Sequence, residues 1–118
     1  MNDIIQKKVE LEAPLYYMKH LQIISAFLNK DFTKKEREVL GFFMSLEGPL
    51  GQDRFGTTSR KEVMVKLKLS PGGLGNYLKA FERKKFIYKD AANNFKIAEY
   101  LIPNEKRQGY QLRLDRKF

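Results

Sequence analysis

Residues 70–87, S-P-G-G-L-G-N-Y-L-K-A-F-E-R-K-K-F-I, constrain the fold of this chain more than any other stretch. Ser70 followed by Pro71 is typical of a helix start, because the serine side chain caps a free backbone amide and proline has the φ of a first helical residue. Apolar residues then recur at i, i+3, i+4 and i+7, which predicts a helix with one buried face formed by Leu74, Tyr77, Leu78 and Phe81.

A second short helix is expected just before this one. Ser59 and Glu62 have the spacing of a capping box, in which each side chain bonds a backbone amide of the first turn. Val63 and Leu67, with Met64, then fall on one helical face. Only residues 68 and 69 separate the two periodic runs, which favours a helix-turn-helix corner.

The other face of the 70–83 helix carries small, amide and basic residues. At about 100° per residue, the positions that point away from the apolar stripe are Gly72, Asn76, Lys79, Ala80 and Arg83. Glycines permit close approach to a major groove, an asparagine can pair with a base edge, and Lys or Arg can reach bases or phosphates. An ordinary solvated helix face is the competing interpretation, and periodicity alone does not separate the two.

The distribution of charge favours nucleic acid as the partner. The chain has a net charge of +9, yet residues 1–58 carry 8 Lys/Arg and 8 Asp/Glu. Residues 59–118 carry 15 Lys/Arg and 6 Asp/Glu, so the whole surplus lies on the expected helix-turn-helix and the segment after it. Lys and Arg that neutralise phosphates release counterions, which provides affinity for double-stranded DNA.

Composition argues against several other classes of protein. There is no cysteine, and His20 is the single histidine, so thiolate or multi-histidine metal sites and cysteine nucleophiles are excluded. His20 is expected to be a partly buried structural residue. We expect no enzyme activity, no cofactor, no metal and no small-molecule substrate. No apolar run approaches membrane-spanning length, and a cytoplasmic protein is expected, in the host cell if the chain is phage-encoded.

Residues 1–32 are expected to form an N-terminal extension. Residues 3–12 alternate with Ile5, Val9 and Leu11 on one side, which predicts an edge strand or an arm that reaches a partner subunit. A helix then begins near Pro14, and its apolar residues cover most of its circumference. This excess favours a homodimer contact, with three aromatic anchors: Tyr16, Tyr17 and Phe27.

Residues 33–58 predict a core helix followed by a glycine-rich loop. Thr33 and Glu36 form a capping box, and Gly48-Pro49 is expected to end the helix, whose core stripe is Val39, Leu40, Phe43 and Leu46. Gly51 to Thr58 differs by one residue from a phosphate-binding loop: Thr57 replaces the lysine, and no strand precedes it, so nucleotide binding there is rejected. Arg54 is expected to touch phosphate or to be solvated.

The last third of the chain predicts a small antiparallel sheet. Strands are expected at F-I-Y-K-D, at residues 95–103 and at residues 110–114. The class is therefore α+β, mainly α: a three-helix core with a small antiparallel β-wing. The wing tip is either Asp90–Asn94 or Asn104–Gly109, and we favour the second because Lys106 and Arg107 can contact the DNA backbone or minor groove.

This pattern resembles the winged helix-turn-helix family of DNA-binding regulators, of the kind found in phages and plasmids. The resemblance covers about residues 33–114 and rests on T-K-K-E-R-E-V-L-G-F-F and on the 70–87 stretch, which follows the family's S-x-x-x-L-x-x-x-L-x-x-L-x-x-K-G-x-I run. It implies a winged helix-turn-helix domain over 33–118. It also implies DNA contacts at Lys61, Ser70, Gly72, Gly73, Asn76, Lys79 and Arg83, with free amides at the helix start available to a phosphate.

Three functions are weighed. The first is double-stranded DNA binding by a transcription or replication regulator, for which related domains often act as dimers on two half-sites. The second is a winged-helix protein–protein adaptor in a phage-type transcription or packaging complex, because this fold serves both purposes. The third and weakest is a nuclease built on the E-x-K pattern of Glu82 and Lys84 with Asp53. The target sequence and the sense of regulation do not follow from the residues.

Overall fold

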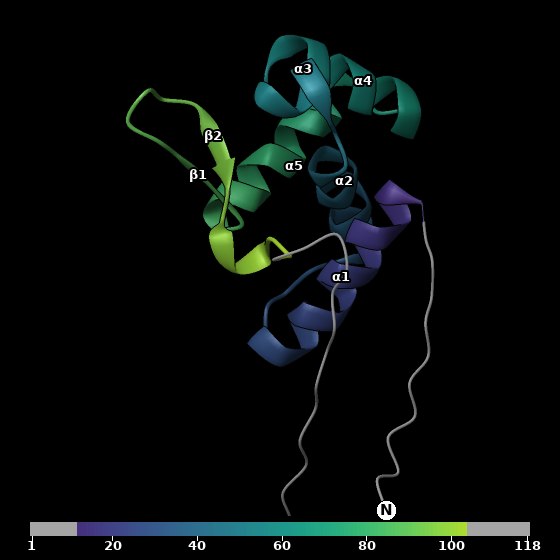
Figure 1. Cartoon of the computed structure of the whole chain (residues 1–118), viewed down its shortest axis with the longest axis vertical. Coiled ribbons are helices and arrows are strands. Elements are labelled where there is room, and N and C mark those ends of the chain that lie inside the picture. Colours follow the sequence, from purple (N-terminus) through teal and green to yellow (C-terminus); the bar gives the residue numbers. More distant parts are fainter. Residues whose placement is uncertain (1–11, 104–118) are drawn as a thin grey trace, which may run out of the picture.

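The structure is a computed structural model that describes residues 12–103 (Figure 1). The α+β, mainly α class is confirmed, since five helices precede a small antiparallel sheet in this part of the chain. Residues 3–11 of the first expected strand, the turn with Lys106 and Arg107, and the strand at 110–114 lie outside the described residues. The elements are α1 (Ala13–Leu28), α2 (Lys34–Met44), α3 (Gly48–Gln52), α4 (Thr57–Leu67), α5 (Pro71–Arg83), β1 (Ile87–Lys89), β2 (Phe95–Ile97) and the 3-10 helix η1 (Glu99–Leu101).

Helix α2 is the centre of the molecule, with α1 on one side and α3, α4 and α5 on the other (Figure 1). Its capping box is confirmed: Thr33 Oγ1 accepts from the Glu36 amide at 3.1 Å, and Glu36 Oε1 accepts from the Thr33 amide at 2.8 Å. The expected core stripe of α2 is also confirmed, because Val39, Leu40, Phe43 and Leu46 are all buried.

The end of α2 differs from the prediction. The helix ends at Met44, and Gly48 and Pro49 begin α3 instead of stopping α2. Arg54 explains the early end: its Nη1 donates to the carbonyls of Phe43, Met44 and Leu46 at 2.6, 3.0 and 2.9 Å. A cationic group thus satisfies carbonyls that a helix end leaves without intrahelical partners.

The start of α4 was also predicted wrongly. The helix begins at Thr57 with Gly56 as its N-cap, and the expected capping box of Ser59 and Glu62 is not formed. Ser59 is 1% exposed, and its hydroxyl lies 2.8 Å from the carbonyl oxygens of Leu50 and Asp53. The hydroxyl therefore bonds the end of α3 rather than the first turn of α4. Residues 48–58 accordingly form α3, a short link and the first two residues of α4, not one loop.

Helix α5 follows the prediction closely. Ser70 is the N-cap and accepts from the Gly73 amide at 3.0 Å, with Pro71 in the first helical position. The side chains of Leu74, Leu78 and Phe81 are buried, while Tyr77 is partly buried against the same core. Residues 68–70 separate α4 from α5, which confirms two helices joined by a tight turn.

The C-terminus of α5 is closed by a Schellman motif. The Phe86 amide donates to the Phe81 carbonyl at 2.8 Å, and the Lys85 amide donates to the Glu82 carbonyl at 3.1 Å. The two phenylalanine rings pack with centroids 6.2 Å apart. Lys85 has φ 64° in this motif, a left-handed conformation that usually selects glycine. The chain therefore holds a lysine where the backbone favours a residue without Cβ.

The sheet is a two-stranded hairpin. Strands β1 and β2 pair antiparallel, with Ile87 opposite Ile97 and Tyr88 opposite Lys96. The tip is residues 90–94, where Asp90 Oδ1 accepts from the amides of residues 92 and 94. The second strand is shorter than the predicted 95–103, because the chain turns into η1 after Ala98 and Tyr100 donates its hydroxyl to the Lys85 carbonyl at 2.8 Å.

Helix α1 packs against α2 through a close backbone approach. A Cβ on Gly41 would lie 2.9 Å from Cγ and 3.0 Å from the amide nitrogen of Met18, so glycine is required there. Only His20 and Leu21 of α1 are buried, whereas Phe27 is 49% exposed, and Leu15 and Leu28 are also exposed. The predicted dimer contact at Tyr16, Tyr17 and Phe27 stays a prediction. No helix in residues 12–103 is long and apolar enough to cross a membrane.

His20 joins α1 to the far end of the described chain, which confirms its structural role. The residue is 4% exposed, and its Nε2 donates to the Leu101 carbonyl at 2.9 Å. Burial lowers the pKa of His20, and the hydrogen bond to Leu101 opposes this shift to a smaller extent.

We expect Lys85→Gly to raise the free energy of unfolding by about 0.5–1 kcal/mol, because glycine adopts a positive φ without the steric cost of a Cβ. Lys85→Ala removes the same charge but keeps the strain, so it is the matched control. Urea unfolding followed by circular dichroism measures both variants. Equal stabilities for the two would contradict a strained backbone at this position.

We also expect a pH dependence that comes from His20. Its pKa is lower in the folded chain than in the unfolded chain, so below about pH 6.5 the unfolded state binds more protons and stability falls. His20→Gln keeps an N–H donor but does not titrate. Thermal melts from pH 5 to 8 should show a steeper acid loss for the native chain than for the variant; parallel profiles would exclude this source.

Candidate nucleic-acid interface

The exposed face of α5 is the strongest candidate site. Asn76, Lys79 and Arg83 are all exposed, and none of their side chains makes a hydrogen bond or ion pair with another residue between 12 and 103. Because the opposite stripe of α5 is buried, the rotation of the helix about its axis is fixed. The prediction that these three side chains point away from the core is confirmed, and their role in DNA binding stays a prediction.

The first turn of α5 is open to solvent and rich in glycine. A Cβ placed on Gly72 or Gly75 would meet no atom within 4 Å, so the fold itself does not require glycine at either position. Gly73 is different, because its Cβ would lie 3.1 Å from Ser70 Oγ. Glycine inside a helix costs about 1 kcal/mol relative to alanine. The two unrequired glycines therefore weaken α5 and leave its backbone accessible.

The expectation of several free amides at this helix start is wrong. Ser70 uses its side chain to bond the Gly73 amide, and Pro71 has no N–H. The Leu74 amide is bonded to the Ser70 carbonyl at 2.9 Å. Among the residues of this first turn, the amide left for a ligand is that of Gly72.

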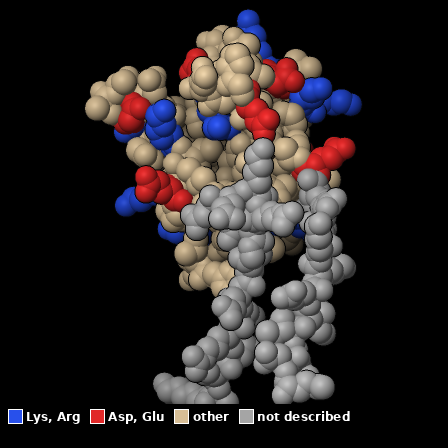
Figure 2. Space-filling view, in the orientation of Figure 1, with Lys and Arg blue, Asp and Glu red and all other residues tan. Residues whose placement is uncertain are grey.

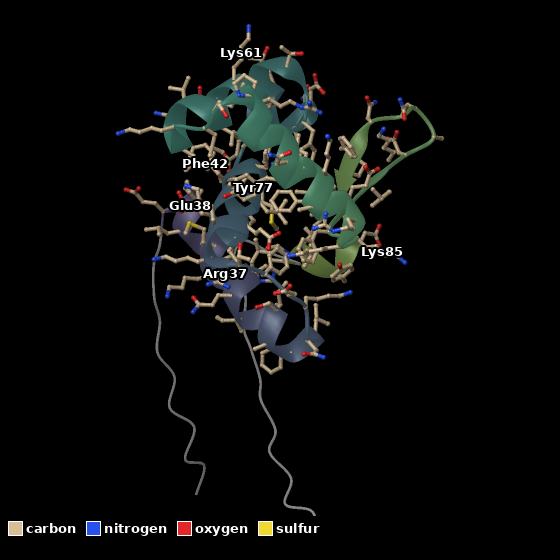
Figure 3. All side chains as sticks on the ribbon, turned by 180° about the vertical axis from the view of Figure 1, so that it is seen from behind. Arg37, Glu38, Phe42, Lys61, Tyr77 and Lys85 are labelled. Carbon is tan, nitrogen blue, oxygen red and sulfur yellow. The ribbon has the colours of Figure 1, made fainter. Side chains whose placement is uncertain are left out.

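Lys61 is exposed on α4, one turn further into the helix than expected, because α4 begins at Thr57. Figure 3 shows Lys61 of α4 at the top of the view and Lys85 near the end of α5, with α5 running between them on the side that faces the viewer. Tyr77 points from α5 towards Phe42 of α2 and belongs to the packed side of the helix (Figure 3). The exposed cations therefore span the α4–α5 unit.

The charged groups of two basic residues, Lys84 and Arg54, are bonded to other parts of the protein and are therefore less available to a ligand. Lys84 Nζ bonds both carboxylate oxygens of Glu36 at 2.9 and 3.0 Å and the Asp31 carbonyl at 3.0 Å. Arg54, expected to contact phosphate or to be solvated, caps α2 instead. Burial lowers the pKa of Arg54, partly offset by Tyr17. The sequence predicted neither contact, because Glu36 lies 48 residues before Lys84 and because α2 was expected to end later than the carbonyls that Arg54 caps.

The hairpin supplies cations that sequence reasoning missed. The favoured wing tip with Lys106 and Arg107 lies outside the described residues, and the tip that is described, residues 90–94, has no Lys or Arg. Its strands carry Lys89 and Lys96, both exposed. Lys89 Nζ lies 5.2 Å from the centroid of the Phe95 ring, a cation–π contact. The alternation of residues along β2 was the signal that could have predicted an exposed Lys96.

The nuclease alternative needs Glu82 and Lys84 to act together. Lys84 instead bonds the Glu36 carboxylate, while Glu82 is exposed. Within residues 12–103, no group of three or more His, Cys, Asp or Glu side chains could hold a metal ion. The face seen in Figure 2 shows Lys and Arg interspersed with Asp and Glu rather than a continuous basic patch.

Comparison with protein-family models, curated proteins and solved structures finds no match for this chain.

We expect Gly72→Ala and Gly75→Ala each to raise the free energy of unfolding by about 0.5–1 kcal/mol, because the new methyl group meets open space in a helix. Gly41→Ala is the control and should destabilise, since its Cβ would collide with Met18. Urea titration measures all three. A loss of stability in the α5 variants would show that their glycines serve the fold.

Proposed function

We propose that this chain is a winged helix-turn-helix protein that binds double-stranded DNA and regulates transcription or replication. The observation that carries the proposal is the exposed, unpartnered face of α5 with Asn76, Lys79 and Arg83. An amide side chain and two cations on one helix face are the groups that read base edges and bind phosphates in a major groove.

The arrangement of elements supports this proposal. In this proposal α2, α4 and α5 form the three-helix core and the β1–β2 hairpin serves as the wing. The short turn between α4 and α5 and the antiparallel pairing of β1 with β2 support it. The outward positions from Gly72 to Arg83 extend over about 16 Å of helix at 1.5 Å per residue. A length of this order matches the few base pairs that one recognition helix contacts in a groove about 12 Å wide.

Gly72 and Gly75 are not required by the fold, and we assign them a role in DNA binding. Without a side chain at Gly72, the helix backbone can approach a DNA strand closely, and the Gly72 amide is available to a phosphate. Gly75 enlarges the same opening. The cost of these glycines in helix stability is then offset by contact with DNA, a trade that is common at binding sites.

A homodimer on two half-sites is part of the proposal. Leu15, Phe27 and Leu28 are exposed apolar side chains of α1, and Phe27 and Leu28 lie together at its C-terminal end. A two-fold contact through this end of α1 would present two copies of α5 to DNA, and half-sites about one helical turn apart would follow from the symmetry.

The test is a DNA-binding titration at several salt concentrations, with the target taken from selection on a random duplex pool. Binding should weaken with salt in proportion to the number of phosphates contacted. Lys79→Gln should weaken all duplexes alike and lower the salt dependence by about one phosphate, whereas Asn76→Ala should cost about 1–3 kcal/mol of discrimination between target and random DNA.

Lys34→Gln is the matched control, because Lys34 is an exposed lysine at the start of α2. It should bind DNA like the native chain. A chain that binds no duplex at physiological salt would favour the adaptor function, and an equal loss in the Lys34 and Lys79 variants would show that general charge, not the α5 face, governs binding.

A further inference from the structure

A groove of about 270 Å³ lies between α1 and the first turns of α2. Its lining residues are Leu15, Met18, Lys19 and Gln22 of α1 and Lys34 and Arg37 of α2. The four α1 residues have the spacing i, i+3, i+4 and i+7, so their side chains share one face of that helix. No residue of α5 or of the β1–β2 hairpin lines the groove, so it is separate from the surface proposed to contact DNA.

The packing of α1 on α2 shows that both sets of side chains face this groove. Lys34, Arg37 and Gly41 lie at i, i+3 and i+7 of α2 and therefore on one face of it. A Cβ on Gly41 would lie 2.9 Å from Met18 Cγ. The face of α2 that carries Lys34 and Arg37 is therefore the face turned towards Met18 and its neighbours on α1. Figure 3 shows Arg37 on the part of α2 that lies beside α1.

Three cations line the groove. The Arg37 guanidinium is held in place, because its Nη1 donates to the Phe32 carbonyl at 3.0 Å. Lys19 is exposed, and its Nζ donates to Gln22 Oε1 at 3.3 Å, a neutral partner that leaves the charge uncompensated. Lys34 is exposed and makes no ion pair with a described residue. Within residues 12–103 no Asp or Glu lines the groove, so its charge favours an anionic ligand.

The groove also has an apolar part, which narrows the class of ligand. Leu15 is 48% exposed, and Met18 lines the groove one helical turn further along α1. The phosphate backbone of a duplex offers no apolar group to these side chains, whereas a peptide places aliphatic side chains and carboxylates within a few residues of each other. Carboxylates bind guanidinium and ammonium groups through charged hydrogen bonds. The arrangement therefore favours an acidic peptide over nucleic acid.

We propose that the groove between α1 and α2 binds a short acidic segment of another protein. An aliphatic side chain of that segment packs on Leu15 and Met18, and its carboxylates bind Lys19, Lys34 and Arg37. The groove and the outward face of α5 belong to different helices, so one chain can hold duplex DNA and this partner together. The inference goes beyond the proposed duplex binding and does not depend on it.

The experiment is fluorescence anisotropy of the full chain at about 0.15 M salt with the labelled peptide acetyl-Glu-Leu-Glu-Glu-Leu-Glu-amide. A second peptide replaces each leucine with serine and keeps every charge. We expect the leucine peptide to bind at least fivefold more tightly, because only this peptide fills the apolar part of the groove. Equal binding of the two peptides, or no binding of either, would overturn the proposal.

Unlabelled duplex DNA is then added to the bound leucine peptide. The peptide should stay bound, because the groove and the α5 face are separate surfaces. Displacement by the duplex would place the peptide on the nucleic-acid interface and would contradict the groove assignment.

Variants locate the peptide on the protein. Lys19→Gln removes one exposed charge and should weaken binding about threefold, and Leu15→Ser should weaken it about fivefold through lost apolar contact. Both positions are exposed, so the fold is retained. Lys34→Gln should weaken peptide binding to the same extent as Lys19→Gln, while duplex binding stays unchanged.

Lys96→Gln is the matched control for these variants, because Lys96 is an exposed lysine of the hairpin and does not line the groove. It should bind the leucine peptide like the native chain. A loss equal to that of Lys19→Gln would show that net charge governs peptide binding, and the groove assignment would then be wrong.

Discussion

The carboxylate of Glu36 connects the two helices on which the candidate interface depends. It closes the capping box of α2 through the Thr33 amide and, in the same position, binds Lys84 just beyond α5. Glu36 is 5% exposed, so both of its partners compensate a charge that water reaches poorly. The start of α2 and the end of α5 are thereby joined, and the stacked rings of Phe32 and Phe86, with centroids 3.8 Å apart, add an apolar contact at the same place. The orientation of α5 follows from this junction.

The sequence predicted a helix start correctly where the capping side chain and the amide that it bonds belong to the same helix turn. Thr33 with Glu36, and Ser70 with Pro71, form the predicted helix starts because every group involved lies within one turn. Ser59 and Glu62 have the same capping-box spacing as Thr33 and Glu36 but do not cap α4. The Ser59 hydroxyl bonds carbonyls at the end of α3, and α3 itself has a glycine-rich sequence that no propensity scale would assign to a helix. Tertiary contacts thus decided between two equivalent patterns.

The candidate site was predictable to the extent that it depends on helical period. The outward face of α5 follows from its apolar stripe, but the number of available cations does not follow from counting charges. Lys84 and Arg54 satisfy backbone carbonyls or a buried carboxylate, and neither contact leaves a trace in composition. Distances between segments are the information that a single sequence lacks.

The close contact of Gly41 with Met18 holds α1 directly against α2. The same helix also reaches η1 through His20, and residues on both sides of α2 are therefore mechanically linked. A displacement of α1 relative to η1 would break the hydrogen bond between His20 Nε2 and the Leu101 carbonyl, so the two ends of the described residues are tied to each other.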